Sequence, residues 1–242
     1  MFNLFKSKKT ISSIADCIDC QKGATAVVIG AGGTLNDYAK SIKKFIDRDN
    51  VFTIGINNMT AFYVPSYHLW TNKQRWRDFG SCIDSEKSKL MFGAGLSEKL
   101  IKKHFNGDYI VVNYTDSLAK AEKESKIEYH DGKIYGHFRT AGCLAIVIAH
   151  LFGAKEIFVV GMDGFTLHGR GEVESGNKNQ HCYGKGYTDD ATWDECVEKD
   201  RVVYKNLNEI NDFGAKFKII TPTKFECFYD NSILNKLSKR IN

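Results

Sequence analysis

The stretch VVIGAGGTL, residues 27–35, places an apolar run directly before three glycines and a Thr-Leu pair. This order predicts a buried strand, a tight glycine turn and the start of a helix. Such a turn presents backbone N–H groups and the positive end of a helix to an anion. Three ligands would fit there: a dinucleotide such as NAD, a triphosphate, or a nucleotide that carries a sugar. A fourth interpretation is that the glycines serve only close backbone packing.

Strand-like and helix-like segments alternate along the rest of the chain, which is the order expected when helices connect parallel strands. The expected strands are 24–29, 51–56, 67–70, 89–92, 109–112, 156–160 and 216–220. The expected helices are 35–46, 140–152 and 189–213, and the second is apolar enough to be buried. The third carries its apolar residues on one face, which we expect to pack on the core: Trp193, Val197, Tyr204, Leu207 and Ile210. The sequence therefore predicts an α/β fold with a single doubly wound, mostly parallel Rossmann-like sheet. Ligands of such sheets bind at the carboxyl ends of the strands.

Length and composition indicate one domain with short additions. A chain of 242 residues with 43% hydrophobic residues can bury a full core, and two prolines leave little room for an extended linker. We expect an N-terminal extension over residues 1–22, a Rossmann-like nucleotide-binding domain over 23–228, and an amphipathic basic helix over 229–242.

Charge and cysteine content narrow the partners and the compartment. The net charge of +5 favours anionic ligands or an acidic membrane surface, and it is too small to indicate a nucleic-acid-binding protein. Seven cysteines, an odd number, favour reduced thiols in the cytoplasm. For the pair Cys17 and Cys20, two half-buried residues are a better interpretation than a zinc or redox site.

No apolar run approaches the roughly 20 residues needed to cross a bilayer. The C-terminal segment instead predicts an amphipathic helix. Its apolar face comprises Ile233, Leu234, Leu237 and Ile241, and its basic side chains are Lys236, Lys239 and Arg240. Packing of this helix on the domain is the favoured interpretation. Peripheral docking on the inner, anionic face of a membrane is the alternative.

Glycines and polar residues, few of them charged, follow the expected strands where each one ends. They are Gly30 to Thr34, Asn57 and Asn58, Thr71 and Asn72, and the later Gly161 to Asp163. An NAD site would need a third glycine and an acidic residue where Leu35 and Asn57 stand, and a triphosphate loop would need Gly-Lys-Ser or Gly-Lys-Thr. Asparagine amides suit ribose hydroxyls or a pyrimidine edge. A simple turn explains Asn57 and Asn58 equally well.

Taken together, VVIGAGGTL, GINN (55–58), WTN (70–72), FRTAGCLAIVIAHLFGAKEIFVVGMDGF (138–165) and HCYGKGYTDD (181–190) resemble the small bacterial sialyltransferases of glycosyltransferase family 42. The order and rough spacing of the blocks match over most of residues 25–222. A weaker likeness links the same blocks to motility-accessory proteins and archaeal pterin diphosphokinases. An alternative function is therefore that of a nucleotide-binding protein of one of those kinds.

The sialyltransferase resemblance implies a GT-A-like, inverting and metal-independent enzyme without a cofactor. It would transfer a nonulosonic acid, sialic acid or a Kdo-like sugar, from a CMP-sugar to a glycan hydroxyl, as in lipopolysaccharide or capsule biosynthesis. A homo-oligomer is also compatible with this resemblance. The implied donor-binding residues are Gly30, Gly32 and Gly33 at the phosphate, Asn57, Asn58 and Asn72 at sugar and ribose hydroxyls, Thr140, Ala141 and Gly142 at the cytidine or carboxylate end, and Asp163 beside them.

Three residues are candidates for the chemical step. His181 is the candidate base, because its ordinary pKa near 6.5 suits proton transfer at neutral pH. The family carries two histidines four residues apart and uses the second, whereas this chain has Lys185 at that second place. The family steadies the leaving phosphate with two tyrosines, and here Arg170 is the nearby donor suited to a phosphate. A surface role for His181 and a solvated loop position for Arg170 are the alternatives.

No metal site is expected. The pair Asp47 and Asp49 forms an Asp-x-Asp motif, but it precedes the second strand and so belongs to the amino edge of the sheet. Cys182 follows His181 directly, and adjacent side chains on an extended segment point to opposite sides. A Cys-His catalytic pair is therefore not expected there.

Overall fold

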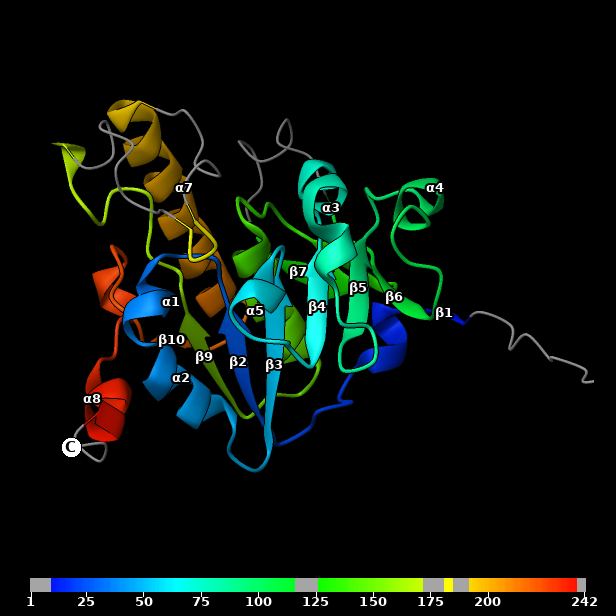
Figure 1. The fold of residues 1–242 in the computed structure, drawn as a ribbon, viewed down its shortest axis with the longest axis horizontal. Helices are drawn as coiled ribbons and strands as arrows, with labels where there is room; N and C mark the ends of the chain where they lie inside the picture. Colours follow the sequence, from blue (N-terminus) through cyan, green and yellow to red (C-terminus); the bar gives the residue numbers. More distant parts are fainter. Residues whose placement is uncertain (1–9, 116–125, 172–180, 185–191, 239–242) are drawn as a thin grey trace, which may run out of the picture.

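Eight parallel strands form the central sheet, in the spatial order β1-β6-β5-β4-β3-β2-β9-β10 (Figure 1). They belong to a computed structural model that describes residues 10–115, 126–171, 181–184 and 192–238. The strands are β1 (Ile11–Ser13), β2 (Thr25–Ile29), β3 (Val51–Ile56), β4 (Tyr67–Trp70), β5 (Lys89–Gly93), β6 (Tyr109–Val112), β9 (Glu156–Val160) and β10 (Lys218–Ile219). The α/β fold with a parallel sheet is thus confirmed.

The chain changes direction across the sheet at β2. Successive strands from β2 to β6 are added on one side, and β9 then pairs with the other side of β2. The junction of β2 and β9 is therefore the topological switch point, where doubly wound sheets bind their ligands. In Figure 1 the carboxyl ends of the strands point to the top of the picture.

Helices cover both faces of the sheet. They are α1 (Thr34–Asp37), α2 (Ala39–Ile46), α3 (Lys73–Phe79), α4 (Glu98–Ile101), α5 (Ala141–Leu151), α7 (Trp193–Asp212) and α8 (Ser232–Ser238). Short 3-10 turns are η1 (Ile14–Cys17), η2 (Met59–Ala61), η3 (Gly80–Cys82) and η5 (Glu226–Phe228). An antiparallel hairpin of β7 (Glu128–His130) and β8 (Lys133–Tyr135) lies outside the main sheet.

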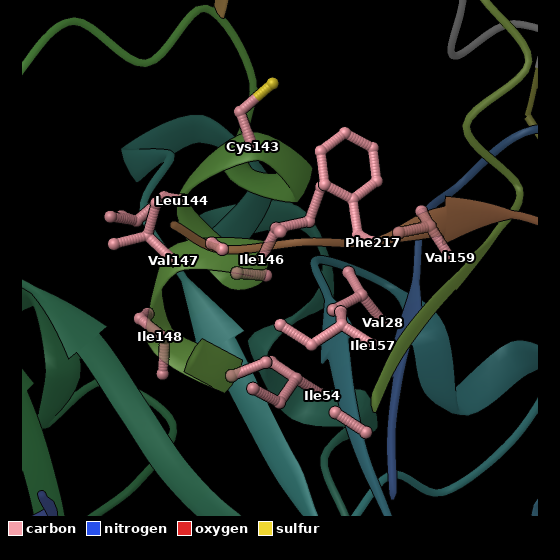
Figure 2. Close-up of a cluster of buried hydrophobic side chains, with 14 of the residues drawn as sticks. Val28, Ile54, Cys143, Leu144, Ile146, Val147, Ile148, Ile157, Val159 and Phe217 are labelled. Carbon is pink, nitrogen blue, oxygen red and sulfur yellow. The ribbon is translucent and has the colours of Figure 1, made fainter. Parts of the chain in front are cut away.

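Alternation of side chains along β2 explains the two layers of core. Ala26 and Val28 belong to the cluster that contains α5, while Val27 and Ile29 belong to the cluster that contains α2. Figure 2 shows Val28 beside Ile54, Ile157 and the apolar side chains of α5. Because α5 packs between the sheet and α7, its residues 142–149 are all buried. The prediction that this helix is buried is confirmed for residues 142–149.

Several element boundaries differ from the expected ones. The helix expected over 35–46 is two helices, because Tyr38 leaves helical geometry with ψ of 12° and ends α1. Residues 216–220 contribute only the two-residue strand β10. Residues 11–13, expected to lie in an extension, pair with β6 as an edge strand of the main sheet. The start of the helix expected at 189 lies outside the described residues, and α7 begins at Trp193 after a Thr192 capping box.

The buried face of α7 is different from the face that the apolar pattern predicts. Val197 and Tyr204 were expected to face the core, but each is 45% exposed. Asp200 and Asn206 are buried instead, at 7% and 1% exposure. The polar side chains occupy the inner stripe because the loops they meet there offer backbone hydrogen-bonding groups, as described below.

The C-terminal helix α8 packs on the domain through at least one of its apolar residues. Leu234 is 2% exposed and lies in the same core cluster as Ile42 and Phe45 of α2. Ile233 is half-buried against the same cluster, and Lys236 is exposed. The side chains of the other expected face residues, Leu237, Lys239, Arg240 and Ile241, lie outside the described part. In the described part of the chain, no helix combines the length and the apolar character that crossing a membrane requires.

Candidate functional site

The ends of β2 and β9 pack against each other at the switch point with almost no space between their backbones. The Gly30 N–H donates to the Val160 carbonyl at 2.8 Å, and the Gly32 N–H donates to the Gly161 carbonyl at 2.8 Å. A Cβ on Gly30 would lie 2.3 Å from the Gly161 oxygen. Glycine is therefore required at position 30 by strand packing, whatever else the turn binds.

The Asp163 carboxylate occupies the start of α1. It accepts hydrogen bonds from the Thr34 N–H at 2.9 Å and from the Thr34 hydroxyl at 2.5 Å. A Cβ on Gly32 would lie 2.3 Å from the same carboxylate. Burial raises the pKa of Asp163 to about 6, and the Thr34 hydrogen bonds oppose that rise.

This contact changes the role expected for the glycine turn. The sequence predicts that the start of the helix after the turn offers its N–H groups to a phosphate, but the Thr34 N–H already donates to a protein carboxylate. Gly33 is the N-cap residue of α1 and has ordinary right-handed helical geometry. A phosphate bound near this turn would therefore have to use groups other than the Thr34 N–H.

Residues 181–184 lie across the glycine turn. His181 forms a bridge with Gly32, the Cys182 N–H donates to the Ala31 carbonyl at 2.9 Å, and the Asn36 amide donates to the Cys182 carbonyl at 3.1 Å. The structure thus brings His181 beside Gly32, although the two residues are 149 positions apart in the sequence.

The ring contacts of this segment extend toward α3. The His181 ring stacks on Tyr183 with centroids 5.1 Å apart, and Tyr183 contacts Phe79 at 5.5 Å. Burial raises the pKa of Cys182 to about 12, so this residue is a thiol at neutral pH and not a nucleophile. Lys185, the other candidate base, lies outside the described residues.

The start of α5 reaches the same junction from the opposite face. Thr140 is its N-cap, and the Thr140 hydroxyl accepts the Cys143 N–H at 3.2 Å. A Cβ on Gly142 would lie 2.8 Å from the Met162 side chain, so Gly142 packs directly on the end of β9. Ala141 between them is half-buried.

The ends of β3 and β4 form the neighbouring part of the edge. Asn57 has a positive φ of 52°, and its carbonyl oxygen pairs with Nε2 of His68. His68 is fully buried, and burial lowers its pKa to about 4, so the ring is neutral. With Nε2–H donating to Asn57, the other ring nitrogen, Nδ1, is left as an acceptor.

Four buried polar atoms in this part of the edge have no hydrogen-bond partner among the residues that the structure describes. They are Oδ1 of Asn57, Oδ1 of Asn58, Nδ1 of His68 and Nε1 of Trp70. The His68 and Trp70 rings are 4.7 Å apart, and Asn57 continues the ladder with its N–H on the Leu69 carbonyl at 3.2 Å. A buried polar atom that makes no hydrogen bond costs about 1–3 kcal/mol, so these atoms provide capacity for a bound hydroxyl, amide or water.

His68 and Trp70 were not among the residues singled out in the sequence. Their strand, YHLW, shows one polar ring inside an otherwise apolar run. A histidine fully buried in a central parallel strand is uncommon, because such strands are usually rich in aliphatic residues. A histidine in an apolar strand could therefore have marked this position in the sequence, although the sequence does not say where the ring nitrogens point.

One expected donor-binding residue and one candidate for the chemical step are at the surface. Asn72 is exposed, and its Oδ1 accepts the Arg75 N–H at 3.0 Å as the N-cap of α3. Its amide nitrogen remains the group with which it would contact a ligand. Arg170 is an exposed residue of the segment that follows β9.

A cleft of about 450 Å³ lies at the other, amino edge of the sheet. Its lining includes the first residues of β2, β3 and β9, together with both acidic and basic side chains: Arg48, Asp49, Glu156 and Lys236. Because this edge lacks the strand ends of the switch point and mixes both signs of charge, we place the candidate site at the carboxyl edge instead. Within the described residues, no three His, Cys, Asp or Glu side chains are grouped so as to hold a metal ion.

No protein-family model matches this chain, and no curated protein matches its sequence.

Proposed function

We propose that the protein is an inverting, metal-independent glycosyltransferase that moves a nonulosonic acid from a CMP-sugar to a glycan hydroxyl. The observation that carries the proposal is the cluster of buried, unpartnered polar atoms of Asn57, Asn58, His68 and Trp70. The cluster lies at the ends of β3 and β4, on the side of the glycine turn away from β9, and His181 contacts that turn at Gly32. The resemblance of the sequence blocks to family 42 supplies the reaction class.

The cluster suits a neutral, hydroxyl-rich ligand. The two asparagine oxygens and Nδ1 of His68 can accept hydrogen bonds, and the Trp70 indole can only donate one. A sugar or ribose hydroxyl both donates and accepts. A bare phosphate offers acceptors alone at neutral pH, so it fits the Trp70 indole but not the three acceptors.

The phosphate of the donor needs a different set of groups. Asp163 at the start of α1 would repel a phosphate when ionised, and its raised pKa of about 6 reduces that charge only below neutral pH. Arg170 on the segment after β9 is the candidate phosphate ligand, because a guanidinium can form two parallel hydrogen bonds to phosphate oxygens. Gly30, Gly32 and Gly33 would then shape the wall beside the phosphate.

The chemical step is a single displacement. The acceptor hydroxyl attacks the anomeric carbon of the donor sugar, its proton passes to His181, and the bond to the phosphate oxygen breaks to release CMP. The anomeric carbon inverts, and no covalent intermediate with the enzyme forms. Lys185 is the alternative base, because it stands where the family has its second histidine. The acceptor glycan is expected at the cytoplasmic side of a membrane, with α8 and residues 239–242 as the candidate peripheral contact.

Ligand-dependent thermal stability tests the nucleotide class. CMP is expected to raise the melting temperature without magnesium and in the presence of EDTA, because a ligand at 100 times its Kd adds about 2.7 kcal/mol to the unfolding free energy. CDP serves as the second cytidine nucleotide. Stabilisation by ATP with magnesium alone would favour the diphosphokinase-type alternative. A response to neither nucleotide would contradict the proposal.

Three variants separate binding from chemistry. Asn57→Ala and Arg170→Ala are expected to weaken CMP binding about tenfold or more, whereas His181→Ala retains CMP affinity and loses turnover of the CMP-sugar. Isothermal titration and a CMP-release assay measure the two quantities. His130→Ala on the β7–β8 hairpin is the matched control and should change neither. Equal loss of CMP affinity in all three site variants would mean that His181 is a structural residue.

A further inference from the structure

Helix α7 buries two polar side chains where its pattern predicts apolar ones. Asp200 and Asn206 lie on the inner stripe with Cys196, Val203, Leu207 and Ile210. Val197 and Tyr204, which could fill a core, face outward. Burying a carboxylate or an amide is unfavourable unless hydrogen bonds replace its water, so the partners of these two residues explain their position.

Asp200 holds the loop that follows β9. Its carboxylate accepts the Phe165 N–H at 2.7 Å, the Thr166 N–H at 2.9 Å and the Thr166 hydroxyl at 2.7 Å. Gly164, with φ of +87°, turns the chain beside this carboxylate. The same loop starts with Asp163, which holds Thr34 at the start of α1.

Asn206 holds a second loop, the one that leads into α5. Its Oδ1 accepts the Arg139 N–H at 2.7 Å, and its amide donates to the His137 carbonyl at 2.7 Å. A further hydrogen bond at 3.1 Å joins the amide to Glu209 on the next turn of α7. The loop ends at Thr140, the N-cap of α5.

The two loops border the candidate site from different sides. One loop leads from the end of β9 toward Arg170. The other leads into residues 140–142 at the start of α5. Asp200 and Asn206 are six residues apart on one helix, which corresponds to a rise of about 9 Å. A continuous helix therefore sets the spacing between the two loop anchors.

We infer that Asp200 and Asn206 are positioning residues that hold the phosphate side and the cytidine side of the nucleotide site at a set separation. This inference rests on the proposed function, which supplies the ligand and the assignment of each side. Neither residue contacts the nucleotide. Each acts through a loop, Asp200 through residues 163–166 and Asn206 through residues 137–142.

Near-isosteric variants test this role. Asp200→Asn replaces one acceptor oxygen with a donor that faces a loop N–H. Asn206→Asp removes the donor to the His137 carbonyl and adds a charge beside Glu209. The matched control for Asn206→Asp is Asn208→Asp, because the Asn208 amide bonds only to Tyr204 of its own helix among the contacts described here. Asp212→Asn, exposed in the last turn of α7, is the control for Asp200→Asn.

Hydrogen-deuterium exchange of the full-length protein, followed by peptide mass spectrometry, measures the loops without requiring any ligand. Asp200→Asn is expected to raise exchange in the 163–166 peptide at least fivefold, and Asn206→Asp to do so in the 137–142 peptide. The strands β2 and β3 should keep wild-type exchange. Faster exchange throughout the sheet would mean that the variant lowers global stability and would overturn the positioning role.

Affinities for CMP and for cytidine provide the second measurement. Asp200→Asn should lower the affinity for CMP at least tenfold, because it loosens the loop on the phosphate side. Its affinity for cytidine should stay within about twofold of the wild-type value. Asn206→Asp should lower the affinities for CMP and for cytidine by the same factor. Unchanged affinities despite faster loop exchange would overturn the inference. If the wild-type protein binds neither ligand, the proposed function has failed, and the exchange measurement still decides whether the two residues anchor their loops.

Discussion

Two neighbouring parts of the carboxyl edge handle their polar groups in opposite ways. At the junction of β2 and β9, the polar groups of the glycine turn are joined to protein: Gly30 and Gly32 donate to β9, and Thr34 donates to Asp163. At the ends of β3 and β4, four residues bury polar atoms that have no hydrogen-bond partner within the described part of the chain: Asn57, Asn58, His68 and Trp70. The first part is a packing joint, and the second has unused hydrogen-bonding capacity.

The difference shows that a glycine-rich turn need not mark the place where the ligand is held. Glycine permits close approach of any partner, and here the partners are a neighbouring backbone and a carboxylate. The buried unpartnered atoms are a stronger indication of a ligand, because leaving them unsatisfied destabilises the protein. The glycine turn then positions His181 and one wall of the site.

The largest expected effect comes from breaking the packing joint. Gly30→Ala would place a Cβ 2.3 Å from the Gly161 carbonyl oxygen, and both backbones are held by sheet hydrogen bonds. We expect a loss of more than about 4 kcal/mol of unfolding free energy, or failure to fold. Urea unfolding measures it. Gly171→Ala is the control, because a Cβ there meets nothing within 4 Å, and it should change stability by less than about 0.5 kcal/mol. A Gly30→Ala protein with nearly wild-type stability would contradict the packing argument.

The second effect is a pH dependence that belongs to Asp163. Burial raises its folded-state pKa from 3.8 to about 6, so the folded protein binds this proton more tightly than the unfolded chain does. The stability from this group is therefore fully present below about pH 4 and is lost as the pH rises through 6. The loss amounts to about 3 kcal/mol, at about 1.4 kcal/mol for each pKa unit.

The variant Asp163→Asn isolates this contribution. The asparagine cannot ionise, so the variant should gain stability relative to the wild type as the pH rises from 4 to 7. Urea unfolding at several pH values measures the difference between the two proteins, in which the other carboxylates cancel. A difference that stays constant over this range would show that Asp163 ionises freely in the folded protein.

The smallest expected effect compares an unpartnered buried asparagine, Asn58, with a buried asparagine that makes hydrogen bonds, Asn206. Asn58→Leu removes a buried unpartnered oxygen and is expected to raise the ligand-free unfolding free energy by up to about 1 kcal/mol, while it weakens CMP binding. Asn206→Leu is the matched comparison, because it would remove the hydrogen bonds from Asn206 to the Arg139 N–H and to the His137 carbonyl and should cost about 3 kcal/mol. If Asn58→Leu destabilised the protein as much, the Asn58 side chain would be a structural element of the turn.

Much of the fold could be predicted from local patterns. Apolar runs such as 51–56, 67–70 and 156–160 have the observed strand boundaries, because a strand buried on both faces must be continuously apolar. The break at Tyr38, the edge strand at 11–13 and the outward position of Tyr204 were not predicted. Each of them depends on what the segment packs against, which a local pattern does not contain.

For the candidate site too, some features could be predicted from the sequence and others could not. Placing Gly32, Asn57, Thr140 and Asp163 at one sheet edge follows from strand order, since the carboxyl ends of parallel strands share an edge. The pairing of Asp163 with Thr34 and the burial of His68 under the Asn57 turn could not be predicted, because these contacts join residues whose separation along the chain carries no pattern.

The sequence by itself determined the α/β class, the buried helix α5 and the edge of the sheet at which polar residues collect, because hydrophobic periodicity and glycine turns act over a few residues. Only the tertiary structure decided that Asp163 caps α1, that His181 lies across the glycine turn, and that Asp200 and Asn206 face inward. Hydrogen bonds between distant segments form only once the core has brought those segments together. The unfavourable burial of Asp163, Asp200 and Asn206 is offset by partners that lie elsewhere in the chain.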